Sequence, residues 1–180
     1  MLNFFSILII AIGLSMDTFT LSMSYGMLGI NKKNIIKISI MVGIFHYVMP
    51  LLGNKLGNLV LSYIPINPEI ILGFIFLILS IQLIISLLKK ESIMEINNLF
   101  SMIIFSFTVS IDSFSVGIGL QAIKINMFIS ALIFMIISSI FTFIGINFGN
   151  KIIKLIGDKA QVIGILLLLS LSINYIIKGC

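Results

Sequence analysis

Six apolar runs, each about as long as a lipid bilayer is thick, constrain the fold of this chain more than any other feature. A helix needs about 20 mostly apolar residues to cross a membrane. Of the 180 residues, 59% are hydrophobic and 9% are charged, well outside the usual composition of soluble domains. Hydropathy places the candidate spans at residues 2–28, 35–60, 68–88, 97–122, 126–150 and 160–178. The sequence therefore predicts an all-α membrane protein of six transmembrane helices, with a single transmembrane domain over residues 1–180.

The first run is expected to remain in the mature protein as a span. It lacks the basic start and the small-residue cleavage site of a signal peptide, and it carries Asp17 at mid-depth. The single cysteine, Cys180, excludes an internal disulfide and a cysteine-based metal cluster. The net charge of +5 comes from lysines spread over short loops, so we expect a lipid bilayer and no nucleic acid as partner.

The lysines also predict the orientation of the chain in the membrane. If the spans alternate in direction, one side carries Lys32, Lys33, Lys37, Lys89, Lys90, Lys151, Lys154 and Lys159, and the other carries Lys55, Lys124 and Lys178. Cytoplasmic loops are enriched in lysine and arginine. We therefore expect a multi-pass protein of the plasma membrane with both termini outside the cytoplasm.

The second half of the chain repeats the first. "SMD" at Ser15–Asp17 matches "SID" at Ser110–Asp112, at an offset of 95 residues. "PLLGNKLGN" at Pro50–Asn58 matches "TFIGINFGN" at Thr142–Asn150, at an offset of 92. Repeat one covers about 1–90 and repeat two about 96–180. Each repeat holds three spans, an odd number, so the second must be inverted relative to the first; many secondary transporters have this architecture.

Two aspartates stand at matching positions of the two repeats, each within an apolar span. On the first and fourth spans, polar residues at helical spacing place Asp17 and Asp112 on stripes that should face inward. Intramembrane carboxylates are costly and commonly mark ion pathways. The alternative is that each is a protonated group that only packs against a neighbouring serine.

Hydroxyl side chains adjoin both aspartates in the sequence: Ser15, Thr18, Ser110 and Ser113. Carboxylates and hydroxyls together predict a hard, oxygen-rich site that suits Mg, Ca or Mn. One divalent cation would cancel two carboxylate charges. Two protons would cancel them too, because burial and mutual repulsion favour protonated carboxyl groups. The same pair could therefore carry either one dication or two protons.

The only histidine, His46, lies in the middle of the second span. It is either a packing imidazole or a borderline nitrogen ligand and proton acceptor of the same site. The chain contains no P-loop, no HExxH, no GxSxG and no Rossmann glycine pattern. We therefore expect neither an enzyme nor a nucleotide-driven pump, and no bound cofactor.

Several motifs over nearly the whole chain resemble those of the bacterial manganese exporter (MntP-type) family. They are "LSMDTF", "YVMPLLG", "SIDSFSVGIGL" and "GDKAQVIG". The resemblance implies a six-span exporter of Mn²⁺ within a lysine-exporter-like superfamily, with Asp17 and Asp112 essential. The sequence departs from the family pattern at His46, where Glu or Gln is common, and at Gln161, where Glu is common.

These observations favour a secondary transporter that exports Mn²⁺, by proton antiport on the two aspartates. Exporters of another divalent cation or of a cationic metabolite remain alternatives. A further alternative is a non-transporting membrane interaction protein of the sporulation type. The sequence leaves the oligomeric state open.

Overall fold

The described part of the chain is built from helices. The computed structural model describes residues 4–27, 30–63, 67–88, 98–121, 126–155 and 159–179, and all regular structure in these ranges is helical. The helices are α1 (Phe4–Gly26), α2 (Lys32–Tyr63), α3 (Pro68–Leu88), α4 (Leu99–Thr108), α5 (Ile111–Gln121), α6 (Met127–Leu155) and α7 (Lys159–Gly179). Within these ranges six helical segments are long and apolar enough to cross a membrane, which confirms the predicted fold class.

The fourth span lies where it is predicted, but it is two helices rather than one. α4 ends at Thr108, residues 109 and 110 form a turn, and α5 begins at Ile111. Serine hydroxyls bond to backbone carbonyls around this turn: Ser110 Oγ donates to Phe107 O at 2.8 Å, and Ser113 Oγ donates to Ser110 O at 2.6 Å. Such side-chain bonds compete with the regular helical ladder. The span is therefore interrupted next to Asp112.

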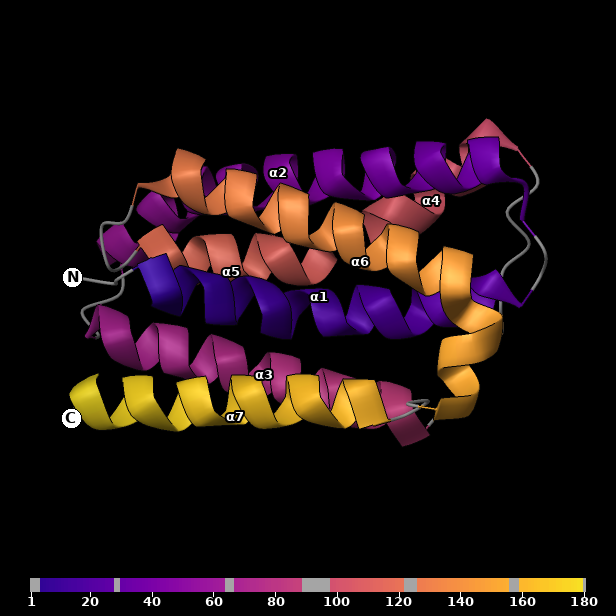
Figure 1. Cartoon of the computed structure of the whole chain (residues 1–180). Helices are drawn as coiled ribbons and strands as arrows, with labels where there is room; N and C mark the ends of the chain where they lie inside the picture. Colours follow the sequence, from indigo (N-terminus) through magenta and orange to yellow (C-terminus); the bar gives the residue numbers. More distant parts are fainter. Residues whose placement is uncertain are drawn as a thin grey trace.

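Successive spans run in opposite directions (Figure 1). Both ends of the chain lie at the left of this view, which we call the terminal end of the bundle. At the right, α1, α3 and α6 end and α2, α4 and α7 begin. We call this the lysine-rich end, because the described helices carry Lys32, Lys33, Lys37 and Lys159 there. As predicted from the sequence, α1 and α5, which carry the two aspartates, run in opposite directions.

Contacts between helices follow a pattern that connects the two halves. α1 packs on α6, and α5 packs on α2. α2 of the first half therefore lies against the Asp112-bearing helix α5, and α6 of the second half lies against the Asp17-bearing helix α1. Both α2·α6 and α3·α7 are also in contact, as are α1·α7 and α3·α5. Each of these contacts has its counterpart when the two halves are exchanged. The inverted repeat itself stays a prediction.

Glycines of the two halves permit the close approach of these helices. A Cβ added at Gly145 of α6 would lie 2.6 Å from Ser22 Cβ on α1. A Cβ added at Gly53 of α2 would overlap the backbone oxygen of Phe114 on α5. Gly53 and Gly145 are repeat counterparts, at the offset of 92 residues found in the sequence. The two GxxxG segments therefore make equivalent helix contacts.

The described interior holds two apolar core clusters. One core cluster joins side chains of α1, α3, α5, α6 and α7, among them Ile10, Phe76, Val116, Phe134 and Leu168. The second joins α1, α2, α4 and α6 through side chains such as Tyr25, Ile38 and Phe105. Large apolar side chains on the outer surface, such as Phe74, Leu166 and Ile177, are exposed. An apolar exterior is what a lipid environment requires.

Candidate functional site

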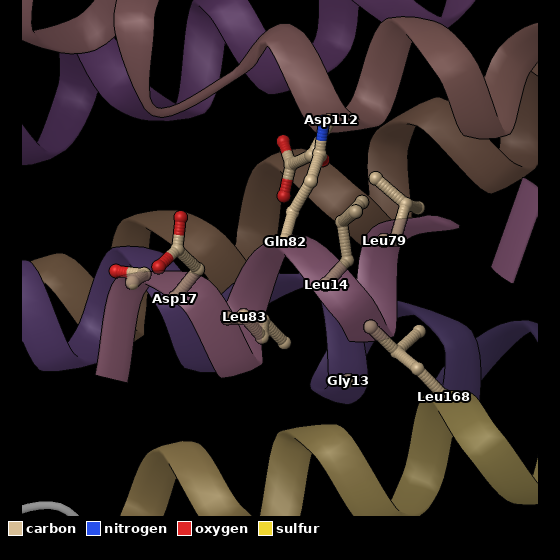
Figure 2. A pocket seen from close by; sticks show the side chains of 9 residues that line it. Gly13, Leu14, Asp17, Leu79, Gln82, Leu83, Asp112 and Leu168 are labelled. Carbon is tan, nitrogen blue, oxygen red and sulfur yellow. The ribbon is translucent and has the colours of Figure 1, made fainter. Parts of the chain in front are cut away.

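A cavity of about 140 Å³ lies among α1, α3, α5 and α7 and receives both aspartates. The residues that line it are Gly13, Leu14, Asp17, Leu79, Gln82, Leu83, Ser86, Asp112 and Leu168. Figure 2 shows their side chains. Because Asp17 belongs to the first half and Asp112 to the second, the cavity lies where the two halves meet. The structure thus brings together two carboxylates that are 95 residues apart in the sequence.

Asp17 lies in the interior of α1, and its side chain is partly buried. Gly13 and Leu14 precede it by about one helical turn and line the same cavity. Two ionised carboxylates that line one cavity would repel each other. A bound cation would relieve that repulsion.

Asp112 lies in the first turn of α5, directly after the break in the fourth span. The backbone N–H of Ser113 donates to Asp112 Oδ1 at 2.7 Å. Free N–H groups and the positive end of the helix dipole favour a negative charge at this position. A carboxylate has a second oxygen that can bind a cation. The break in the fourth span therefore places one backbone N–H donor on the Asp112 carboxylate.

Gln82 and Ser86, both on α3, add an amide and a hydroxyl to the cavity. The sequence did not predict these two residues, because the third span contains no ionisable group at mid-depth. The signal that could have found them is their spacing of four residues, which places two polar side chains on one face of an apolar helix.

The four hydroxyl residues predicted as ligands pack elsewhere in this structure. Ser15, Thr18, Ser110 and Ser113 are fully buried, but they are not among the described residues that line the cavity. Ser15 Oγ and Ser138 Oγ on α6 are 2.8 Å apart and share a hydrogen bond. Ser110 and Ser113 bond to backbone carbonyls at the helix break. Their part as cation ligands stays a prediction.

His46 is fully buried in α2 and likewise lies outside the described lining of the cavity. Its Nδ1 is 2.9 Å from Val42 O. Within the described part of the chain, its Nε2 has no hydrogen-bond partner. Pro50, four residues further on, has no N–H to donate to the His46 carbonyl. Nε2 is a buried ring nitrogen without a hydrogen bond in the described part of the chain. The role of His46 as a ligand stays a prediction.

The donor set of the cavity consists of oxygen ligands: two carboxylates, one amide and one hydroxyl. The described residues contain no group of three or more His, Cys, Asp or Glu side chains that could hold a metal ion. A site with few charged ligands, completed by neutral oxygens and water, suits a hard divalent cation in transit better than a tightly held structural metal.

Comparisons with known proteins agree with this chemistry. Residues 29–176 match a family model described as "Putative manganese efflux pump". A relative from Bacillus pumilus, named "Putative manganese efflux pump MntP", is 32% identical over 92% of this chain and 91% of its own. Relatives of the same name from Bacillus velezensis and Methanocorpusculum labreanum are each 30% identical, over 96% and 97% of this chain and 94% and 96% of their own. No solved structure matches.

Proposed function

The chain belongs to the family of manganese efflux pumps, and from that premise we propose that it exports Mn²⁺ as a secondary transporter with Asp17 and Asp112 as ligands. One observation carries the assignment of the ligands: each half of the chain contributes one carboxylate to a single cavity at mid-span. Transporters built from inverted repeats bind their substrates at such an interface.

The charge of the site fits a divalent cation. Two ionised carboxylates carry two negative charges, which one Mn²⁺ cancels and a monovalent ion does not. Moving a dication out against a negative-inside potential costs about 4.6 kcal/mol per 100 mV, twice the value for one charge. The sequence carries no nucleotide-binding motif, so we propose that protons entering on the same two carboxylates supply this energy.

The proposed orientation places the lysine-rich end in the cytoplasm and both termini outside, in the plasma membrane. The basis is the excess of lysines at that end, eight against three in the whole sequence. In this orientation the cation enters at the lysine-rich end and leaves at the terminal end.

Neutralising one aspartate at a time tests the paired-ligand proposal. Asp17→Asn and Asp112→Asn keep the size and polarity of the side chain and remove the charge that balances the dication. In cells without another manganese exporter, we expect both variants to abolish manganese tolerance and Mn²⁺ efflux while their abundance in the membrane stays near normal. Glu69→Gln is the matched control, because Glu69 lies in the first turn of α3 and away from the described cavity lining. Wild-type efflux by both well-expressed aspartate variants would overturn the proposal.

The cation that is exported is tested by metal challenge. Cells with and without the gene are exposed in turn to Mn, Fe, Co, Zn and Cd, and their metal content is measured. We expect the gene to lower the content of Mn. A decrease confined to another metal would favour an exporter of that cation, and no change for any metal would favour a non-transporting membrane protein or an exporter of a cationic metabolite.

Proton coupling needs a separate measurement. In proteoliposomes that contain a pH-sensitive dye, Mn²⁺ entering from outside should exchange for protons, so the lumen should become more alkaline. Transport of Mn²⁺ without a change in lumenal pH would reject the antiport and leave Mn²⁺ transport itself intact.

A further inference from the structure

The polar lining of the cavity reaches from the aspartates toward only one end of the bundle. Ser86 lies in the last turn of α3, and Gln82 lies one turn deeper on the same face. α3 ends at the lysine-rich end (Figure 1). Ser86 therefore lies between that end and Gln82, and Gln82 lies at the level of Asp112 (Figure 2). In Figure 2 the side chain of Gln82 points toward Asp112.

On the other side of the carboxylates, the bundle is packed with apolar side chains. Ile10 of α1, Phe76 of α3 and Val116 of α5 are fully buried members of one core cluster. Each lies one or two turns from the cavity residues of its own helix, in the direction of the terminal end. A charged ion cannot cross such a layer without a large penalty. The path from the carboxylates is thus closed toward the terminal end.

We propose that Gln82 and Ser86 form the access route by which a divalent cation reaches Asp17 and Asp112 from the lysine-rich end, and that this structure is the state of the protein open to that end. This inference rests on the proposed function. It gives Gln82 and Ser86 a role in cation access, and it implies that the cavity opens toward the lysine-rich end.

The chemistry of the two side chains suits this role. A hard divalent cation accepts amide and hydroxyl oxygens in place of water. These neutral ligands replace lost hydration without adding charge, so the two carboxylates alone balance the dication. The volume of about 140 Å³ can hold an ion with a few waters, since one water occupies roughly 30 Å³. The amide of Gln82 can also donate to a carboxylate when no cation is bound.

Transport kinetics of variants on α3 test the route. Gln82→Leu removes the amide and keeps a side chain of similar size, and Ser86→Ala removes the hydroxyl. Ser80→Ala is the matched control, because Ser80 is a buried serine of the same helix that bonds to Leu77 O and is not among the described lining residues. With Mn²⁺ supplied at the lysine-rich face of oriented vesicles, we expect the half-saturating concentration to rise about tenfold for Gln82→Leu, which corresponds to roughly 1.4 kcal/mol. The rise should be smaller for Ser86→Ala and absent for Ser80→Ala.

The outcomes separate this inference from the function on which it rests. If the wild-type protein transports no Mn²⁺, the proposed function fails. If it does, and Gln82→Leu and Ser86→Ala both keep the half-saturating concentration of Ser80→Ala, the access route is wrong while manganese export stands.

Chemical accessibility provides a second measurement that does not depend on transport. Because Cys180 is the only cysteine, Cys180→Ser gives a thiol-free background. In that background, Ser86→Cys should react with a charged, membrane-impermeant thiol reagent applied at the lysine-rich face, and Mn²⁺ should slow the reaction. Ser80→Cys should not react. Reaction of Ser86→Cys only from the terminal face, or equal reactivity of both variants, would overturn the inference.

Discussion

His46 presents a lone acceptor nitrogen to the interior of the bundle. A carbonyl can only accept, so Nδ1, 2.9 Å from Val42 O, carries the ring hydrogen of the neutral imidazole. Nε2 is then the acceptor, and no described residue donates to it. A proton or a cation could use that lone pair, which makes Nε2 the atom to test.

Two amide substitutions distinguish the two nitrogens of His46. Gln places a polar atom near the position of Nε2, whereas Asn reaches only the position of Nδ1. If Nε2 takes part in transport, His46→Gln and His46→Glu should retain much of the Mn²⁺ efflux, and His46→Asn and His46→Ala should lose most of it. Efflux is measured against membrane abundance for each variant. Near-wild-type efflux by all four would show that His46 only packs.

Residues next to the aspartates in the sequence do not line the cavity, because helix geometry turns their side chains away from it. With 3.6 residues per turn, Ser15 lies about 200° and Thr18 about 100° around α1 from Asp17. Ser15 accordingly bonds to Ser138 on α6. The two acids could be predicted because a charge in an apolar span has few explanations. Gln82 could not, because an uncharged polar residue is common on packing faces as well as in ion pathways.

The tight helix contacts of α1·α6 and α2·α5 should depend on single glycines. Gly145→Ala would place a methyl group 2.6 Å from Ser22 Cβ, and Gly53→Ala would place one against the Phe114 backbone. Relief requires the helices to separate, so each substitution should lower the stability by about 1–3 kcal/mol. Thermal unfolding of the purified protein in detergent, followed by size-exclusion chromatography, measures the effect.

Gly13→Ala is the control for this prediction. Its added Cβ would lie 3.3 Å from Leu168 Cδ2, the end of a flexible side chain that can move. We expect a midpoint close to that of the wild type. Equal midpoints for all three alanine variants would show that the helices do not depend on glycine at these contacts.

At the level of helices, all six spans could be predicted from hydropathy, and the third has the predicted bounds, residues 68–88. The break at residues 109–110 could not be predicted from the sequence, because no proline or glycine lies there. At the break the Ser113 N–H bonds to the Asp112 side chain, and two serine hydroxyls bond to backbone carbonyls, which are local side-chain bonds that compete with the helical ladder. α1 carries the matching Ser15 and Asp17 and remains continuous, so the same short motif permits both conformations.

The topology of the whole molecule can be tested with its own thiol. Both ends of the chain lie at the terminal end of the bundle, and α2 begins at the lysine-rich end. In cells without an outer barrier, a membrane-impermeant maleimide should label Cys180 without permeabilisation. A cysteine at position 33 (Lys33→Cys in a Cys180→Ser background) should react only after the membrane is opened.

Each other labelling pattern contradicts a different part of the prediction. Reversed labelling would invert the orientation, and equal labelling of both sites in sealed cells would indicate dual insertion. Labelling of both sites from one side only would contradict the odd number of spans between them and the inverted repeat.

The packing of α1 on α6 has a consequence for biogenesis. About 100 residues separate the end of α1 from the start of α6, and synthesis at about 5–20 residues per second takes roughly 5–20 s to cover them. During that time α1 is in the bilayer or the insertion machinery without its partner, with Asp17 exposed at a cost of about 2.5–3.5 kcal/mol if it is charged. The ribosome makes α2, which packs on α5, early in synthesis. It makes α6, which packs on α1, late. Neither half can complete its own contacts, so the cavity that holds both aspartates is assembled only after translation has reached α7, which contributes Leu168.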